Sequence, residues 1–480
     1  MGRRGIVRGM PDLSRRIFLG ALSGAALPAV AVCPADPRTV CNLSELHSVA
    51  TAGVQAVRDA DEVRQALRRW PGSVSVGGGR YSMGGQTALA GGLQLDMRGM
   101  DGLVAFDAAA RTVRVQAGMR WRALQALIDP LDLAVRTMQS YANFTVGGSV
   151  SVNCHGRYVG HGAIAASVRA LQLVLPEGSI VETSRTHAPD LFRAALGGYG
   201  AVGVITEVEL ALDENLRIER SAQSVALDDY PAWFTSQVLA DPAALLHNAD
   251  LLPPDFTQPQ AITWRRSQAA LTEAGRLRPV GGSHLVDRAA LWALTELGVG
   301  PALRRHVVQP WRDRPAVVWR NHEASRDVAE LEPAQRDTST YVLQEYFVPP
   351  GRLVPFVRAM APLLAPRPTH ATVNVSIRHA PADPDSLMAW TGADGEGVFC
   401  CVLYVKQRTT PAAQQAVAAW TRALVALALA HGGRHYLPYQ PHASQAQFEA
   451  AYPQAATLRR LRREIGAQRL SNSLWQGYGV

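Results

Sequence analysis

Lysine is almost absent from this sequence: among 480 residues, Lys406 is the only one. Arginine supplies nearly all of the 48 positive side chains, which stand against 40 acidic ones and give a formal net charge of +8. The strong preference for arginine over lysine is explained more simply by a GC-rich coding sequence than by phosphate binding. No basic run is interleaved with aromatic residues, as single-strand nucleic-acid binding requires. We therefore expect no nucleic-acid partner.

Cysteine is also scarce, with five residues at positions 33, 41, 154, 400 and 401. They form no CxxC pair, and no histidine-rich spacing accompanies them, which argues against a disulfide scaffold and against structural zinc. We expect no metal. Cys33 and Cys41 can pair in an oxidising compartment, but an unpaired Cys33, or its removal with the N-terminal segment, is equally compatible with the sequence.

Long apolar runs and high charge density are both missing. Apolar residues make up 47% of the chain and charged residues 18%, and the mean hydropathy is -0.03. These values exclude a wholly disordered chain and a protein with many membrane spans. The length allows about two or three domains, so we expect a soluble globular protein with more than one core.

The N-terminal segment, residues 1–33, has the order of an export signal. Basic residues come first, RRIFLG starts at Arg15, and an apolar stretch rich in small residues ends near Ala31. The stretch is too short for a spanning helix. The paired arginines followed by Phe-Leu resemble the twin-arginine signal, whose export machinery carries folded proteins. We expect a periplasmic or extracellular protein; the alternative is an amphipathic helix that stays attached.

From about residue 46 the pattern alternates between helices and short strands. Helices are predicted at 59–69 and 121–128, and strands at 73–76, 93–96, 112–115, 149–152, 168–175 and 202–206. Glycine clusters recur where strands turn. After about residue 214 the chain carries more proline and arginine-rich helices, with a strand at 341–348 and a helix at 458–465.

Glycine-rich segments carry the candidate chemistry. Residues 76–86 read VGGGRYSMGGQ, and such a run of small residues lets backbone N–H groups converge on an anion. The segment matches neither GxGxxG nor the Walker pattern. Residues 145–157 read TVGGSVSVNCHGR, and GVIT follows at 203–206. Three separated segments in a fixed order are more specific than any one of them.

Together these segments resemble the FAD domain of the vanillyl-alcohol oxidase/p-cresol methylhydroxylase (PCMH-type) superfamily, near the branch of aldonolactone oxidases, alditol oxidases and decaprenylphosphoryl-ribose oxidase. The resemblance spans residues 50–213 and resumes at 433–439 and 452–453. It implies an α+β protein. A PCMH-type FAD-binding domain of two α/β subdomains would occupy 46–213, and a mixed α/β substrate domain 214–440. The C-terminal segment 441–480 would pack back near the FAD domain.

The resemblance implies FAD as the cofactor, with the first loop at the pyrophosphate, the second along the isoalloxazine and ribityl chain, and the third near the adenine. Relatives with covalent flavin often carry a histidine where this sequence has Tyr81, so we predict noncovalent FAD, with Cys154 as the minor alternative for a link. The implied FAD-binding residues are Gly77, Gly78, Gly79, Arg80, Tyr81, Ser82, Met83, Gly84, Gln86, Ser140, Thr145, Gly147, Gly148, Ser151, Asn153, Cys154, His155, Gly156, Gly203, Val204 and Ile205.

The implied reaction removes hydride from an alcohol carbon to flavin N5 while a base takes the hydroxyl proton. Arg378 is retained from a Glu-x-Arg strand of the alditol oxidases, with Ser376 in place of the glutamate. An essential lysine of the lactone and ribose oxidases falls on Tyr439, so its role is empty or has moved to Tyr439, His435 or Lys406. The candidate catalytic residues are Tyr439, Lys406, Arg378, Tyr346, Gln344 and His435.

The resulting hypothesis is an FAD-dependent oxidase or dehydrogenase of a polyol, sugar or aldonolactone, with oxygen or a respiratory carrier as electron acceptor. An amine, a prenyl-linked sugar or a secondary metabolite is the alternative substrate. A non-catalytic flavin-binding protein is the alternative from a different class.

Overall fold

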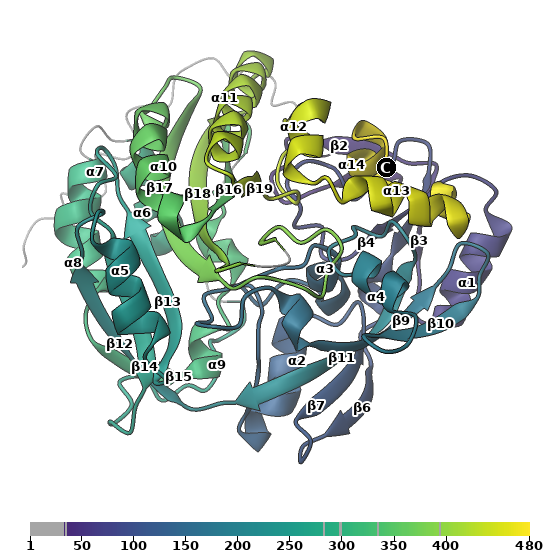
Figure 1. Cartoon of the computed structure of the whole chain (residues 1–480), viewed down its shortest axis with the longest axis horizontal. Coiled ribbons are helices and arrows are strands. Elements are labelled where there is room, and N and C mark those ends of the chain that lie inside the picture. Colours follow the sequence, from purple (N-terminus) through teal and green to yellow (C-terminus); the bar gives the residue numbers. More distant parts are fainter. Residues whose placement is uncertain (1–32, 34–35, 282–283, 297–299, 334–335, 393–394) are drawn as a thin grey trace, which may run out of the picture. The chain divides into compact units, whose positions relative to one another are not determined.

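The computed structural model describes residue 33 and residues 36–281, 284–296, 300–333, 336–392 and 395–480 (Figure 1). The predicted signal segment lies outside the described residues, apart from Cys33. Residues 32–480 form one compact unit. None of the described helices combines the length and the apolar character that crossing a membrane requires. The structure is mixed α/β with several sheets.

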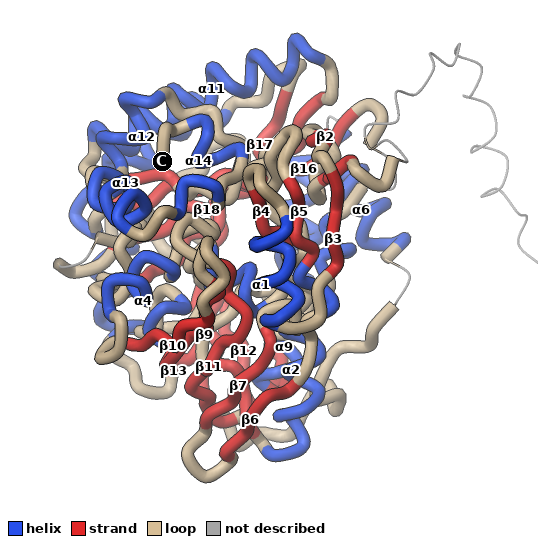
Figure 2. Tube along the Cα trace, turned by 90° about the vertical axis from the view of Figure 1, so that its right-hand side faces the viewer, coloured by secondary structure: helices blue, strands red, loops and turns tan. Residues whose placement is uncertain are grey.

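A small parallel sheet begins the folded part. Its strand order is β3-β5-β4, preceded by an antiparallel β1–β2 pair. Helix α1 lies beside these strands (Figure 2) and buries Val63, Ala66 and Leu67. The Asp59 side chain caps α1 by accepting from the Glu62 N–H. The elements are β1 (Thr39–Cys41), β2 (Ser48–Ala50), β3 (Gly53–Ala56), α1 (Ala60–Arg69), β4 (Val74–Gly77) and β5 (Leu93–Asp96).

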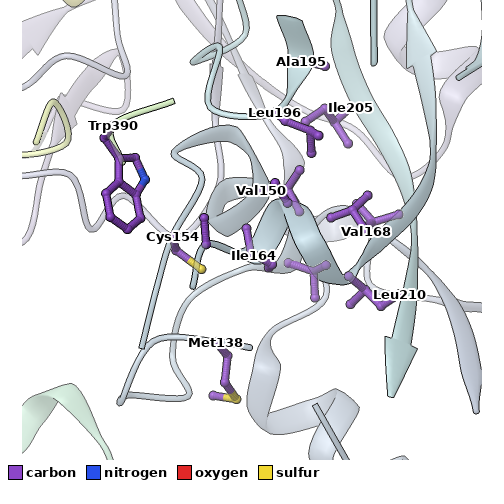
Figure 3. Packing of buried hydrophobic residues seen from close by; sticks show 14 of the residues in the cluster. Met138, Val150, Cys154, Ile164, Val168, Ala195, Leu196, Ile205, Leu210 and Trp390 are labelled. Carbon is purple, nitrogen blue, oxygen red and sulfur yellow. The ribbon is translucent and has the colours of Figure 1, made fainter. Parts of the chain in front are cut away.

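A second sheet follows, with the order β10-β9-β11-β7-β6 and with β8 paired to β11. Its apolar face packs against helices and connecting turns, and Figure 3 shows Val150, Ile164, Val168 and Leu210 in this core. The elements are β6 (Leu103–Asp107), β7 (Thr112–Gln116), α2 (Trp121–Ile128), β8 (Leu133–Val135), α3 (Val146–Ser151), β9 (Val168–Val174), β10 (Ile180–Ser184), α4 (Pro189–Ala195) and β11 (Val204–Glu214).

Helix α3 replaces the strand that we predicted at 149–152. Alternating valine and serine favours a strand by propensity, but Val146 and Val150 stand four residues apart and are both fully buried, which is the spacing of one helix face. Packing against the second sheet therefore overrides the local preference. The other elements predicted before residue 214 form near the expected positions, but the strand predicted at 202–206 is longer than expected, since β11 runs from Val204 to Glu214.

The third sheet has eight strands in the order β15-β12-β14-β13-β17-β18-β16-β19. One face packs against α10 and α11 through a core that includes Val375, Ile377 and Cys401. The elements are β12 (Arg217–Ser224), α5 (Tyr230–Phe234), β13 (Ala244–Leu251), β14 (Gln260–Arg266), α6 (Leu285–Glu296), α7 (Gly300–Leu303), α8 (Gln309–Arg312), β15 (Ala316–Trp319), α9 (Arg320–Glu323), β16 (Ser339–Val348), α10 (Leu353–Met360), β17 (His370–Ala380), β18 (Val398–Arg408), α11 (Pro411–Ala430) and β19 (Arg434–His435).

The C-terminal helices return to the first two sheets (Figure 1). The Ser471 N–H donates to the Val74 carbonyl of β4 at 3.0 Å, and the Trp475 indole donates to the Gly198 carbonyl at 3.0 Å. Asn472 donates to the Tyr199 carbonyl at 2.8 Å. The elements are α12 (Gln445–Ala451), α13 (Ala455–Glu464) and α14 (Ser473–Gly477).

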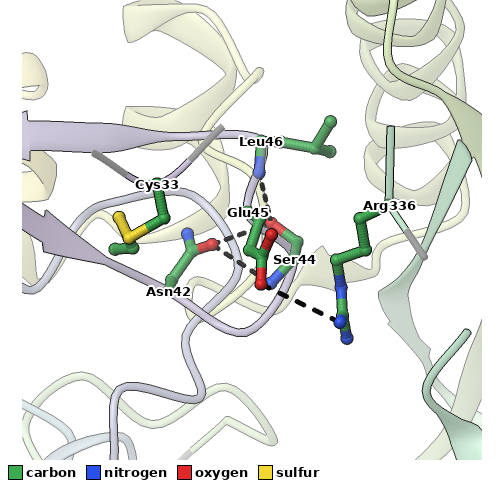
Figure 4. Close-up of a disulfide and its surroundings, with 7 residues drawn as sticks. Cys33, Asn42, Ser44, Glu45, Leu46 and Arg336 are labelled. Carbon is green, nitrogen blue, oxygen red and sulfur yellow. Dashed lines mark hydrogen bonds and ion pairs between the residues drawn. A yellow bond between two sulfur atoms is a disulfide. The ribbon is translucent and has the colours of Figure 1, made fainter. Parts of the chain in front are cut away.

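A disulfide joins Cys33 to Cys41 in β1, with 5.9 Å between their Cα atoms (Figure 4). The sequence left open whether Cys33 pairs with Cys41 or is unpaired, and in the structure the two cysteines are paired. The turn that follows is closed by Asn42, whose side-chain oxygen accepts from the backbone N–H and the hydroxyl of Ser44. Cys33, which we expected at the end of the signal segment, is therefore attached to the folded part of the chain.

Candidate functional site

A cavity lies between the glycine-rich turns of the first two sheets and one face of the third sheet. The first glycine-rich segment follows β4, the second forms the short helix α3, and the third precedes β11. Strands β16, β17 and β18 form the facing wall. Sixteen of the predicted FAD-binding residues line the cavity: Gly78, Gly79, Arg80, Tyr81, Ser82, Met83, Gln86, Ser140, Thr145, Gly147, Gly148, Ser151, Cys154, His155, Gly203 and Ile205.

The first two glycine segments meet directly in this wall. A Cβ atom on Gly78 would lie 2.3 Å from the Thr145 hydroxyl oxygen, and one on Gly147 would lie 2.5 Å from the Ala117 Cβ. The Gly147 N–H donates to the Ala117 carbonyl at 2.8 Å, which fixes the start of α3 on the second sheet. Glycine is therefore required here for close approach, and the bare backbone is left to face the cavity.

Several polar atoms in this wall lack a protein partner. Arg80 Nε, Ser140 Oγ and Thr145 Oγ1 are buried without a hydrogen bond. A buried donor without an acceptor costs ~1–3 kcal/mol, so these groups fit a ligand that is rich in oxygen acceptors. Arg80 is held by Asp96 at 3.2 Å. Tyr81 packs on Phe144, with 4.6 Å between ring centroids, so the same wall also offers aromatic surface to a planar ring.

Five predicted FAD-binding residues lie next to the cavity without lining it: Gly77, Gly84, Asn153, Gly156 and Val204. The Asn153 side chain instead donates to Asp383 at 2.7 Å and accepts from the Ala165 N–H. Gly156 lies against the Met138 carbonyl, where a Cβ would come within 2.2 Å. Val204 alternates with the lining residues Gly203 and Ile205 and points into the opposite core. These residues therefore support the glycine-rich segments on the side away from the cavity.

On the facing wall, the structure brings together Glu345, Arg378 and Tyr439. The Tyr439 hydroxyl donates to Glu345 Oε2 at 3.4 Å, and His155 Nε2 lies 2.5 Å from Glu345 Oε1. Burial and the nearby Glu345 carboxylate raise the pKa of Tyr439 well above its ordinary value. Tyr439 is therefore a hydrogen-bond donor at neutral pH and not a base.

Gln344 and Tyr346, two of the predicted catalytic residues, lie on the other face of the third sheet. Gln344 donates to Thr421 of α11 at 2.7 Å, and the Tyr346 hydroxyl donates to Gln344 at 2.6 Å. Successive side chains of a strand point to opposite faces, so a one-residue difference in register exchanges the two sets. The cavity is lined instead by Tyr341, Leu343 and Glu345.

Lys406 and His435 also lie outside the cavity lining. Lys406 continues the row of Tyr404 on β18 but forms an ion pair with Glu296 of α6. His435 is buried beside Tyr452, and this burial lowers the pKa of its imidazole to about 4. Neither group faces the position where a substrate can lie. The lone lysine is thus a buried cation that is paired with a carboxylate.

Glu345 is the residue that sequence reasoning missed. It stands in the apolar strand segment YVLQEYFV, where a carboxylate is expensive to bury unless it has partners. Strand alternation starting from Tyr341 would have put Glu345 and Leu343 on one face. His155, Glu345 and Cys400 bring ligand-type atoms within 4.8 Å of one another. His155 Nε2 lies 2.5 Å from Glu345 Oε1, which is closer than the ~3.3 Å that separates two ligands on one zinc ion at ~2.0 Å each.

Comparison with known proteins agrees with the chemistry of this wall. Residues 51–184 match the family described as FAD binding domain. This match identifies an FAD-binding domain, with FAD as its cofactor, and the glycine contacts and unpartnered donors described above fit that group.

The chain is also similar to individual proteins over part of its length. The chain is 32% identical over 190 residues to L-galactono-1,4-lactone dehydrogenase of Brassica oleracea, covering 37% of this chain and 30% of the relative. It is 36% identical over 106 residues to a putative D-arabinono-1,4-lactone oxidase of Neurospora crassa, covering 22% and 19%. It is 33% identical over 181 residues to cytokinin dehydrogenase 4 of Oryza sativa, covering 35% and 32%. The chain thus spans a third or less of the length of each of these relatives.

Proposed function

We propose that this protein is an FAD-dependent oxidoreductase that oxidises a CH-OH group of a polyol, sugar or aldonolactone. Electrons would pass to oxygen or to a respiratory carrier. The observation that carries the proposal is the composition of the cavity: the turns of an FAD-binding domain form one wall, and a polar cluster on a separate sheet forms the other. Two of the three relatives described act, by their names, on aldonolactones.

The chain's own residues have distinct parts in this proposal. The flavin, when bound, supplies a hydride acceptor at N5. The glycine turns would hold its pyrophosphate and ribityl chain, with Gly203 and Ile205 toward the adenine. Arg378 would bind a substrate oxygen that carries negative charge. Tyr439, a protonated hydrogen-bond donor, would orient the Glu345 carboxylate that accepts from it. We also propose that FAD is held without a covalent bond, because Tyr81 occupies the position of the expected histidine.

We extend the proposal to the domain organisation. The sheet β3-β5-β4 and the sheet β10-β9-β11-β7-β6 would be the two subdomains of an FAD domain at 46–213. The eight-stranded sheet would be the core of a substrate domain at 214–440. The change of sheet between β11, which ends at Glu214, and β12, which begins at Arg217, supports a boundary near residue 214.

Anaerobic mixing with candidate donors tests the function. Polyols, aldoses and aldonolactones are added to the flavin-loaded protein, and bleaching of the flavin bands is expected with at least one class, with recovery in air or with a quinone. Reduction of the flavin by an amine or a cytokinin alone would favour the alternative substrate class of amines, prenyl-linked sugars or secondary metabolites. The similarity to cytokinin dehydrogenase 4 supports that alternative. Retained flavin that no donor bleaches would favour a non-catalytic flavin-binding protein.

The pair Tyr439→Phe and Lys406→Met compares a residue that lines the cavity with one that does not. Tyr439→Phe removes a donor to Glu345, and a hydrogen bond worth ~1–1.5 kcal/mol corresponds to a flavin reduction rate about 10-fold lower. Lys406→Met is expected to lower stability and to leave the rate unchanged, because Lys406 pairs with Glu296 outside the cavity. Stopped-flow absorption measures both rates. An unchanged rate in Tyr439→Phe would remove Tyr439 from the mechanism, and a slow Lys406→Met would return Lys406 to it.

We propose further that the protein is exported by the twin-arginine route. The Cys33–Cys41 disulfide supports this, since disulfides persist in oxidising compartments. Cleavage after Ala31 would keep Cys33 in the mature chain. Replacing both Arg15 and Arg16 by lysine is expected to hold the protein in the cytoplasm, where peptide mapping under non-reducing conditions should find free Cys33 and Cys41. Unimpaired export of that double variant would contradict the route, and a free Cys33 in exported protein would contradict the pairing.

A further inference from the structure

The carboxylate of Glu345 occupies an unusual position. It is 2% exposed, it stands on the cavity face of β16, and no arginine or lysine forms an ion pair with it among the described residues. Among these residues, the cavity lining contains one other carboxylate, Glu332, which is a quarter exposed and pairs with Arg336 at 3.6 Å. A buried charge without an opposite charge is costly unless several donors hold it, so the surroundings of Glu345 decide what it can do.

Two side chains contact the carboxylate, one at each oxygen. His155 Nε2 lies 2.5 Å from Oε1, and the Tyr439 hydroxyl donates to Oε2 over 3.4 Å. The His155 ring packs beside Trp390 and Tyr436, at ring-centroid distances of 4.9 and 5.9 Å. Oε1 is buried without a hydrogen bond and Oε2 accepts only a long one, so the carboxylate keeps acceptor capacity for a group in the cavity that it lines.

The strand register places a cation near this carboxylate. Glu345 pairs with Val402, and Val402 pairs with Ser376, so the three side chains form a row across one sheet face. Arg378 stands two residues beyond Ser376 and points to the same face, where it lines the cavity. A substrate oxygen in the cavity can thus reach both a positive guanidinium and a carboxylate acceptor.

We propose that Glu345 accepts the hydroxyl proton of the substrate, with His155 and Tyr439 as positioning residues. This inference rests on the proposed function. In the step, the substrate O–H bond would break and its proton would go to the Glu345 carboxylate, while the C–H bond would break and its two electrons would leave as a hydride, which FAD, when bound, would accept. The remaining electron pair forms the C=O bond. The substrate loses one hydride and one proton, the flavin is reduced, and Glu345 becomes neutral.

Other groups of the chain are less suited to this task. Burial raises the pKa of the Cys400 thiol, and burial together with Glu345 raises that of the Tyr439 hydroxyl, so both keep their protons. Lys406 and His435 do not line the cavity. Glu345 contacts His155 and interacts electrostatically with Cys400, Cys401, Tyr439 and the three tyrosines Tyr199, Tyr436 and Tyr452. Arg378 interacts electrostatically with Cys400 and Tyr439 of the same cluster.

The first test uses the oxidised, flavin-loaded protein without substrate. A carboxylate that lines the flavin cavity changes the local field when it takes up a proton, so the absorption bands of the bound flavin are expected to shift with pH. The shift should vanish in Glu345→Gln, persist in the control Glu330→Gln, and move to a different pH in His155→Ala. Glu330 pairs with Arg326 and does not line the cavity. A shift that persists unchanged in Glu345→Gln would overturn the proposal.

The second test is the reduction rate with a donor that bleaches the wild type. Glu345→Gln is expected to lower it about 100- to 1000-fold at unchanged flavin content, as for loss of a general base. Glu345→Asp should recover part of the rate, and formate should rescue Glu345→Ala because a small carboxylate can enter the space left by the side chain. Equal rates in wild type and Glu345→Gln would overturn this proposal alone. A wild type that no donor reduces would overturn the proposed function, and this inference with it.

Discussion

Gly147→Ala is expected to yield a protein that retains less than about a tenth of the wild-type flavin. The added Cβ would lie 2.5 Å from the Ala117 Cβ and 3.0 Å from the Ala117 carbonyl oxygen. Since the second contact is with backbone, α3 must move away from the second sheet and into the cavity. Overpacking of this kind costs ~1–3 kcal/mol, and ~1.4 kcal/mol lost from binding is already a factor of ten.

The matched control for this substitution is Gly53→Ala in β3. The nearest atom to its added Cβ would be Leu93 Cδ1 at 3.8 Å, an ordinary contact, and Gly53 does not line the cavity. Flavin content per protein, read from the absorption spectrum of each purified variant, compares the two. Full flavin content in Gly147→Ala would show that the start of α3 does not face the cofactor.

Glu323→Gln is expected to destabilise the protein by ~3–5 kcal/mol at neutral pH. The Glu323 carboxylate is almost fully buried and binds three arginines: Arg157 at 2.8 Å, Arg326 at 2.8 Å and Arg278 at 3.5 Å. Glutamine keeps the shape but removes the charge, so three guanidinium groups lose their common partner. Because Arg157 follows directly on the 154–156 segment, flavin retention should weaken as well.

The pH dependence of this cluster has a definite sign. Burial alone would raise the pKa of Glu323, but Arg326, Arg157 and Arg278 outweigh it and hold that pKa well below its ordinary value. A depressed carboxyl pKa contributes stability that is complete above the unfolded-state value of ~4.3 and is lost as the pH falls below it. The difference in denaturation midpoint between wild type and Glu323→Gln should therefore narrow in acid.

An exposed ion pair supplies the control for Glu323. Asp228 pairs with Arg358 at 2.6 Å, and both side chains are about 60% exposed. Asp228→Asn is expected to cost less than ~1 kcal/mol. Denaturant-induced unfolding followed by circular dichroism compares the variants. A Glu323→Gln protein as stable as Asp228→Asn would mean that the buried cluster does not hold the 157 segment in place.

The FAD side of the cavity could be predicted from the sequence because it is built from local motifs. Glycine segments at 77–86, 145–157 and 203–206 indicate backbone that closely approaches a ligand or neighbouring chain, and the structure brings all three to one cavity. The strand predicted at 149–152 is the exception. There, the burial of Val146 and Val150 on one helix face could not be inferred from valine and serine preferences alone.

The facing wall could be predicted only in part, since it depends on strand register. Arg378 and Tyr439 line the cavity, but Gln344 and Tyr346 lie behind the sheet against α11, and Glu345 stands between them facing the cavity. A register difference of one residue reverses every side chain of a strand. The partner of Lys406 was also beyond prediction, because Glu296 is distant in the sequence and meets it only through the packing of α6.

The absorption spectrum of the purified mature protein, before and after acid precipitation, shows whether FAD is bound and whether it is attached covalently. With FAD bound noncovalently, as proposed, we expect flavin bands in the native protein and yellow colour in the acid supernatant. Yellow colour retained in the pellet would contradict noncovalent binding and turn attention to Tyr81 or Cys154. A colourless protein that cannot be reconstituted with FAD would contradict the flavin site and the proposed oxidation together.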